Sequence, residues 1–167
     1  VGAGNMSQHR IHEYSLDTPY DLSSTVTHLN TEDLSSSHNY LDGITFKDDG
    51  TKMFIINGNQ NTISQFKLTT PYDVSTLSLE GTYDIDSHDA AGREVAFSHD
   101  GSKMFFIGDA NDKVYEFNLS CNWSIIDGAC DDPANTSDEG KDVLSSIESQ
   151  TATAKQIVIH ATTPVLN

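Results

Sequence analysis

Apolar and polar residues alternate along short stretches of this chain, and turn residues join the stretches. Ahead of Asp49-Gly50, Ile44 and Phe46 alternate with polar neighbours, which is the period of a strand with one face on a core. Residues 53–56, after the turn, are apolar on both faces. Asp-Gly between apolar strands is a strong hairpin signal, because glycine takes the positive φ that such turns require. The pattern therefore predicts a β-hairpin.

The hairpin sequence occurs twice. Residues 42–58 read DGITFKDDGTKMFIING and residues 93–109 read REVAFSHDGSKMFFIGD, with seven of seventeen positions identical. Residues 11–24 match residues 63–76 at seven of fourteen positions, and a weaker third copy begins at Val114. The copies lie 51 or 52 residues apart. An internal repeat of this kind indicates an array of similar structural units.

Each repeat contains about four short predicted strands. They cover residues 42–47, 52–57, 62–68 and 77–84, and then 93–98, 103–108 and 113–119. Four strands in about fifty residues are typical of one blade of a β-propeller. We therefore expect an all-β fold of four-stranded antiparallel blades, in an incomplete ring of about 2.5 blades. The expected units are a partial blade at 1–41, a blade at 42–92 and a last blade at 93–130.

The repeat motif is similar to a known group of propellers. The phrase F-x-x-D-G-x-K-M-F, followed by a polar loop and I-x-x-F-x-L, resembles the blade repeats of YVTN and lactonase-like propellers, and more loosely those of WD-repeat proteins. The resemblance covers residues 1 to about 127. It implies the propeller architecture, but enzymes, lectins and scaffolds share that fold, so it implies no single activity.

The last forty residues have a different pattern. Residues 131–140 are expected to form a polar linker, and residues 141–163 are expected to form a helix because apolar or small residues recur at spacings of three and four. The helix would serve as a stalk or pack on the blades. This tail also resembles the segment that follows propeller repeats in some secreted bacterial surface proteins of autotransporter type.

Composition and charge narrow the possible partners and the compartment. Nine Lys+Arg and 25 Asp+Glu give a net charge of −16, which repels phosphate backbones and anionic lipid. Nucleic acid is therefore not an expected partner, and no apolar run is long enough to span a bilayer. The acidic, Ser/Thr-rich composition favours a secreted or cell-surface protein. There Cys121 and Cys130 would form a disulfide, whereas in a cytosol they would stay thiols.

Few residues stand out as candidates for chemistry. No catalytic, cofactor-binding or metal-binding motif is present, and the seven histidines fall mostly in predicted turns. Arg93 and Glu94 could line a ligand channel near a propeller axis, or form a structural ion pair or a contact between blades. Asp109, Asn111 and Asp112 could offer oxygen ligands to Ca²⁺, but Asp and Asn are also ordinary turn residues.

We expect a non-enzymatic extracellular propeller segment for binding, adhesion or surface assembly. Its partners would be a protein or glycan ligand, or further blades from the parent chain or from other protomers. The alternative is a fragment of a lactonase-like or quinoprotein-like propeller enzyme whose catalytic residues lie largely in other blades. An open ring would expose apolar blade residues at its first end, including Ile44, Phe46, Val95 and Phe97 or their neighbours. Tyr20 and Tyr72 are expected to cover the rim of the core.

Overall fold

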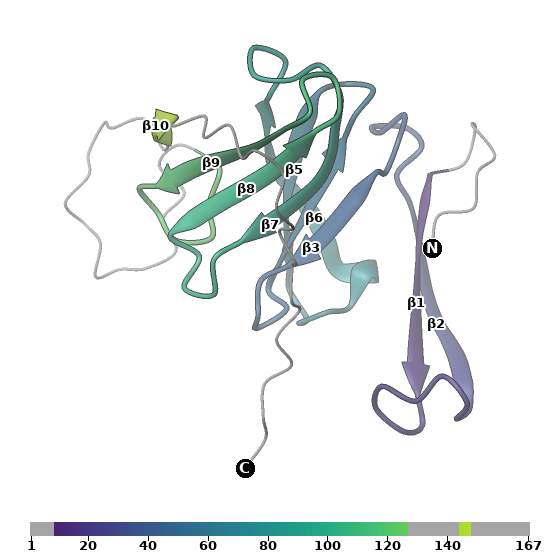
Figure 1. The fold of residues 1–167 in the computed structure, drawn as a ribbon. Helices are drawn as coiled ribbons and strands as arrows, with labels where there is room; N and C mark the ends of the chain where they lie inside the picture. Colours follow the sequence, from purple (N-terminus) through teal and green to yellow (C-terminus); the bar gives the residue numbers. More distant parts are fainter. Residues whose placement is uncertain (1–8, 127–143, 148–167) are drawn as a thin grey trace.

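The computed structural model describes residues 9–126 and 144–147, which are almost entirely strands and turns (Figure 1). The strands are β1 (Arg10–Leu16), β2 (Val26–Asp33), β3 (Gly43–Phe46), β4 (Lys52–Asn57), β5 (Thr62–Leu68), β6 (Leu77–Asp84), β7 (Gly92–Phe97), β8 (Lys103–Gly108), β9 (Lys113–Leu119) and β10 (Leu144–Ile147). Within these ranges the only helical element is the 3-10 turn η1 (Val74–Thr76). The predicted all-β class is confirmed.

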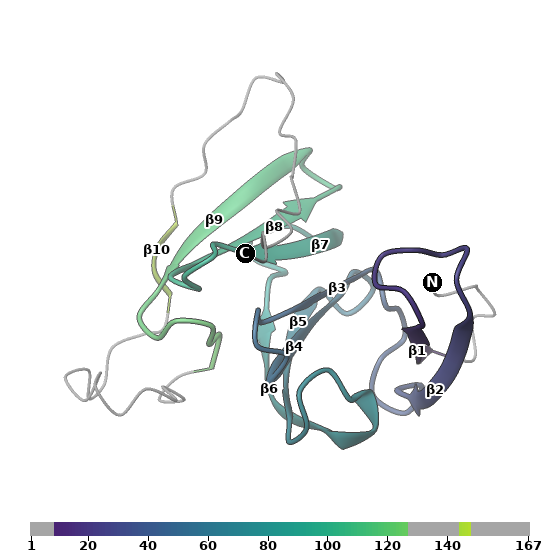
Figure 2. The same cartoon turned by 90° about the horizontal axis from the view of Figure 1, so that it is seen from below.

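The strands form three antiparallel sheets that follow one another along the chain. The first sheet is β1-β2, the middle sheet is β3-β4-β5-β6 and the third sheet is β7-β8-β9-β10. Figure 2 shows the middle sheet between the other two. As far as the structure describes the chain, the sheets form a series and no closed ring.

The backbone conformation repeats with the sequence. Residues with positive φ occupy three equivalent positions of the repeat: Gly50 (72°) and Gly101 (71°), Asn61 (53°) and Asp112 (51°), and Tyr20 (63°), Tyr72 (63°) and Trp123 (58°). The ladder between β1 and β2 and the ladder between β5 and β6 also shift register at equivalent positions of the repeat, after Glu13 and after Gln65. The sheets are therefore copies of one unit down to the level of individual turns.

The larger hydrophobic core lies between the middle and third sheets. Phe54 and Ile56 of β4 and Phe106 of β8 are among its fully buried side chains. The ring of Phe54 lies 4.2 Å from that of Phe97, centre to centre. Burying a large apolar side chain is worth about 1.5–3 kcal/mol, so this junction is a major source of stability.

A smaller core lies between the first and middle sheets. Its buried members are Leu34, Met53, Ile55, Phe66 and Leu68. Only Leu34 comes from the first sheet and its following turn, while Ile11 packs against the cluster from its edge. The first sheet therefore has fewer apolar contacts with the middle sheet than the third sheet has.

The predicted helix over 141–163 is wrong where the structure describes it. Leu144–Ile147 form strand β10, which pairs with β9 through Leu144 opposite Leu119 and Ile147 opposite Phe117. Helix propensity is a weak prior, and the edge of β9 offers main-chain partners that favour an added strand. The rest of this range and the predicted linker at 131–140 lie outside the described residues.

Candidate functional site

One face of the first sheet is open to solvent, and we call it the front face. It consists of four cross-strand pairs: Arg10–Asp33, His12–Thr31, Tyr14–His28 and Leu16–Val26. Because side chains alternate between the two faces of a strand, Ile11, Glu13 and Ser15 lie on the opposite face, toward the middle sheet.

Polar and aromatic contacts hold the front face in place. Arg10 Nε lies 2.9 Å from Asp33 Oδ2. His12 Nδ1 and His28 Nε2 lie 2.9 Å and 2.8 Å from the Thr31 hydroxyl group, so both rings bond to one side chain. The ring of Tyr14 meets that of His28 edge-on at a centroid distance of 5.2 Å. The surface thus offers aromatic area with hydrogen-bonding groups beside it.

Residues at the equivalent positions in the other two sheets are covered. Tyr14 is 54% exposed, whereas Phe66 and Phe117, at the same position of the next two repeats, are 2% and 0% exposed. Phe66 packs against His38, and Phe117 packs against Tyr83 and His88, with ring centroids 5.4–6.0 Å apart. In each case, the covering residues come from the preceding repeat. The front face is therefore the side that the repeat normally buries.

A second set of equivalent positions is likewise exposed in the first repeat and buried in the other two. Leu22 is 81% exposed, whereas Val74 and Ile125 are each 3% exposed. The N–H of Val74 donates to Glu13 Oε2 at 3.1 Å, and the N–H of Ile125 donates to Gln65 Oε1 at 2.8 Å. At both junctions between sheets, a Glu or Gln side chain of the preceding sheet thus accepts a hydrogen bond from the turn that contains Val74 or Ile125.

Each junction also buries one polar side chain from the turn that joins two sheets. His38 lies between the first and middle sheets, and its Nε2 is 2.9 Å from the Ser64 hydroxyl group. Burial lowers the pKa of His38, with a smaller contribution from the nearby His9. Burial therefore disfavours the protonated form of this ring.

Asp89 takes the equivalent place between the middle and third sheets. Its carboxylate accepts hydrogen bonds from the main-chain N–H groups of Ala91, Ala110 and Asn111 at 3.0–3.1 Å. The hydroxyl group of Tyr115 lies 3.3 Å from Asp89 Oδ2. The sequence pattern does not predict that His38 and Asp89 are buried between sheets.

In the second and third repeats, the aromatic residue of the Pro-Tyr turn or its equivalent lies against a hairpin glycine. Tyr72 packs on Gly50, and its N–H donates to the Gly50 carbonyl oxygen at 2.9 Å. Trp123 packs on Gly101 with the same main-chain bond. A Cβ atom at either glycine would collide with the ring. Tyr20 has the same backbone conformation but is 84% exposed, so the expectation that it covers the core is wrong.

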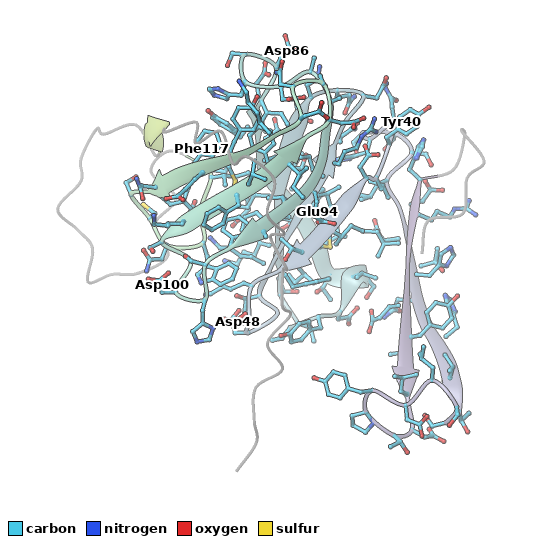
Figure 3. All side chains as sticks on the ribbon, in the orientation of Figure 1. Tyr40, Asp48, Asp86, Glu94, Asp100 and Phe117 are labelled. Atoms are coloured by element: carbon cyan, nitrogen blue, oxygen red, sulfur yellow. The ribbon has the colours of Figure 1, made fainter. Side chains whose placement is uncertain are left out.

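The residues predicted to line a channel lie on β7, the edge strand of the third sheet that contacts the edge strand β3 of the middle sheet. Arg93 lies 2.8 Å from Asp109 Oδ2 and 3.5 Å from Asp42 Oδ1, and the hydrogen bond with Asp109 raises the pKa of Arg93. Glu94 Oε1 accepts from the N–H of Val95 at 3.1 Å. Arg93 thus connects the two sheets through ion pairs with Asp42 and Asp109, and it does not pair with Glu94. Figure 3 shows Glu94 at the level of β3 and β7.

The loop considered for Ca²⁺ takes part in other contacts. Asp109 pairs with Arg93, while the Asn111 side-chain amide donates to the His88 carbonyl oxygen at 3.0 Å. Asp112 is a turn residue with positive φ. Over the described ranges, no three His, Cys, Asp or Glu side chains are grouped to hold a metal ion. A search of the same ranges for a long apolar helix that could cross a membrane found none.

The exposed apolar residues differ from those predicted at the first end. Val95 is buried in the larger core, and Phe97 packs against that core. Phe46 packs against the smaller core, and only Ile44 is clearly exposed, at 39%. Among the described strands, the open surface lies on the first sheet, β1-β2, and not on β3. Cys121 is buried, and Cys130 lies outside the described residues, so their disulfide stays a prediction.

Comparisons with known proteins do not show a family for this chain. No family model and no curated protein matches the chain. Among solved structures, the chain is similar to a functionally unknown protein from Desulfotomaculum acetoxidans DSM 771, with 19% sequence identity and a TM-score of 0.46. The match covers 64% of this chain and 29% of that chain, so this chain spans under a third of the other's length.

Proposed function

We propose that the chain is a segment of a β-propeller of the YVTN or lactonase-like type, and that it works by binding rather than by catalysis. In this proposal, further blades of the same repeat, from the parent chain or from other protomers, cover the front face. A secreted or cell-surface location, with roles in adhesion or surface assembly, is part of the proposal and follows from the acidic composition.

The observation that carries this proposal is the contrast between Tyr14 and its equivalents. Phe66 and Phe117 are buried by a preceding sheet, whereas Tyr14 is 54% exposed. Leu22 shows the same contrast with Val74 and Ile125. Covering side chains of this size is worth about 1.5–3 kcal/mol each, so several together favour association.

The serial arrangement of the sheets supports the propeller part of the proposal. The middle and third sheets each have four antiparallel strands in sequential order, and each packs against its neighbour through the same repeat positions. Stacked four-stranded sheets of this kind are the units of propellers, which contain about four to eight of them. Blades next to the first sheet would bury the front face as the internal junctions do.

The test measures association and exposed apolar surface. Light scattering over a range of concentrations should show self-association, and a hydrophobic dye should bind. Tyr14→Asp should weaken both signals because it places a charge on the front face. The matched control is Leu79→Asp, which changes a residue of similar exposure, 51%, on the outer strand of the middle sheet and should leave both signals unchanged. A monodisperse monomer that binds no dye would contradict the proposal.

A further inference from the structure

Two histidine rings on the front face converge on one hydroxyl group. His12 lies on β1 and His28 lies on β2, and both side chains are exposed. His12 Nδ1 lies 2.9 Å from Thr31 Oγ1, and His28 Nε2 lies 2.8 Å from the same atom. The centroids of the two histidine rings are 5.8 Å apart. One nitrogen of each ring therefore points toward a common centre.

The register of β1 against β2 brings these rings together. His12 lies directly opposite Thr31, and His28 lies opposite Tyr14, which is the next residue of β1 on the same face. Long or aromatic side chains at such diagonal positions of an antiparallel pair are within reach of each other. The two histidines are far apart in the sequence, so no local spacing of metal-ligand type indicates the pair.

Converging imidazole nitrogens are suited to hold a metal ion. Neutral imidazole is the commonest protein ligand of transition metals and suits zinc, copper and nickel. Zinc–nitrogen distances are about 2.0–2.1 Å, so side-chain rotations that move each nitrogen by about 1 Å would bring both to one ion beside the Thr31 hydroxyl group. The rings are exposed, so these rotations need no movement of the main chain.

The charges around the two rings permit a bound cation. Arg10, the cationic member of the front face, is paired with Asp33 at 2.9 Å. The uncharged ring of Tyr14 lies beside both histidines, with centroid distances of 6.4 Å to His12 and 5.2 Å to His28. The net charge of −16 attracts cations of any kind. Selectivity would come from the imidazoles, because Mg²⁺ and Ca²⁺ prefer oxygen ligands.

We propose that His12 and His28 form a two-histidine site for a divalent transition metal ion such as Zn²⁺. His12 would bind through Nδ1 and His28 through Nε2. Water would complete the coordination, because the described ranges hold no group of three His, Cys, Asp or Glu side chains. Structural zinc sites normally have four protein ligands, so this site fits reversible binding rather than a structural role.

Metal binding and covering of the front face should exclude each other. Ser64 and Tyr115, the equivalents of His12 in the next two repeats, are 0% and 4% exposed. Ser64 Oγ lies 2.9 Å from His38 Nε2, and the Tyr115 hydroxyl group donates to the His88 carbonyl oxygen at 2.6 Å. A blade packed on the first sheet in this way would enclose His12 and displace an ion with its waters. This step rests on the proposed function, whereas the site itself does not.

Titration with Zn²⁺ tests the site. Calorimetry on the full chain, at fixed pH and ionic strength, should show saturable binding of Zn²⁺ in the presence of excess Mg²⁺. The Mg²⁺ occupies acidic surface groups without competing for imidazole. NMR spectra of the histidine rings should show metal-dependent shifts at Nδ1 of His12 and Nε2 of His28. Shifts confined to other histidines would overturn the proposal, even if Zn²⁺ bound.

Substitution of each ligand should remove the same binding event. His12→Gln and His28→Gln should each weaken it by at least about tenfold, because the remaining imidazole binds without a linked second ligand. Both positions are exposed, and circular dichroism should show that the variants stay folded. The matched control is His99→Gln, since the His99 side chain is 96% exposed and lies beside Asp48 on a different surface. Equal effects of the three substitutions would overturn the proposal.

Light scattering tests the competition and separates this inference from the proposed function. Saturating Zn²⁺ should lower the average mass of the self-associating chain, whereas Mg²⁺ and the His12→Gln chain should show no such effect. An unchanged mass with Zn²⁺ bound would overturn the competition and leave the site. A chain that binds Zn²⁺ through the two histidines but never self-associates would overturn the proposed function alone. Self-association without Zn²⁺ binding at His12 and His28 would overturn this inference alone.

Discussion

The side chain of Gln65 in the middle sheet accepts a hydrogen bond from the main-chain N–H of Ile125 at 2.8 Å. Gln65 is fully buried, and its amide group also donates to Glu80 at 2.7 Å. The contact ties the end of the third repeat to the preceding sheet. It is the counterpart of the bond from Val74 to Glu13 one repeat earlier.

Replacing Gln65 by methionine should therefore destabilise the protein. The new side chain has a similar size but leaves the N–H of Ile125 without its buried acceptor, which costs about 1–3 kcal/mol. Urea unfolding followed by intrinsic fluorescence measures the change. Lys67→Met is the matched control, since Lys67 lies two residues further along β5 with an exposed side chain and should change stability by less than about 0.5 kcal/mol. Equal effects of the two substitutions would contradict the assigned role.

Gly101→Ala should lower the free energy of unfolding by about 1–3 kcal/mol. Gly101 has a φ of 71° and lies under the ring of Trp123, so an added methyl group is strained and also clashes. Thermal unfolding would measure the loss. As a control, Asp112→Gly places glycine at a position with a φ of 51° and should leave stability nearly unchanged. A harmless Gly101→Ala would mean that the contact between Trp123 and the hairpin is not formed in solution.

Stability should decrease in two stages as the pH falls. Burial lowers the pKa of His38 below its ordinary value of 6.5, so the unfolded chain binds a proton that the folded chain does not. Stability should therefore begin to decrease as the pH falls below about 6.5. Replacing His38 by Gln should flatten the dependence that begins below about pH 6.5, as measured by urea unfolding at fixed ionic strength. An unchanged profile would contradict the buried, neutral histidine.

The second stage comes from carboxylates in the turns. Hydrogen bonds from neighbouring Ser side chains and main-chain groups lower the pKa of Asp33 and Asp100 to about 2. Burial acts to raise the pKa of Asp49, but hydrogen bonds from Thr51 and Lys47 outweigh it and lower the value to about 2. The unfolded value is 3.8, so this stabilisation is complete above that pH and is lost as the pH falls through about 2. Asp100→Asn should reduce the slope in this acid range and leave the slope above pH 5 unchanged.

The predicted disulfide between Cys121 and Cys130 should be found by intact-mass measurement with and without reductant. The oxidised chain should be two mass units lighter, since two hydrogen atoms are lost when the bond forms. On the chain-entropy model, closing so short a loop contributes about 2–3 kcal/mol, so reductant should lower the unfolding midpoint. Cys130→Ser should reproduce the effect of reduction. Two free thiols in protein from an oxidising compartment would refute the prediction.

The strands of the two clear repeats could be predicted closely from the sequence. Residues 52–57 and 62–68 were predicted as strands and form β4 and β5 with the same bounds. Alternating apolar residues and Asp-Gly turns are local signals, and here the tertiary structure agrees with them. The Asp-Gly turns lie at one end of the sheets, as Figure 3 shows for Asp48 and Asp100, with Asp86 at the opposite end.

The features that could not be predicted depend on neighbouring sheets. Tyr20 and Tyr72 have almost the same local sequence, yet only Tyr72 has a hairpin glycine to cover. His38 and Asp89 are polar residues in turns, and their burial arises only when the next sheet packs on them. Leu144 and Ile147 fit a helical spacing as well as a strand, and the edge of β9 decides between the two.

The unequal cores between the sheets imply that the molecule does not open all at once. Within the described residues, the two hydrophobic cores lie between neighbouring sheets, so the stabilities of the sheets should combine as in a linear chain of coupled units. The first sheet shares the smaller core and has one internal strand pair, so its amides should exchange with solvent through a low-energy opening. The amides of β8 lie beside the larger core and should exchange only when the middle and third sheets separate. A force applied at the amino-terminal end would then unfold the repeats in sequence order, beginning with β1 and β2.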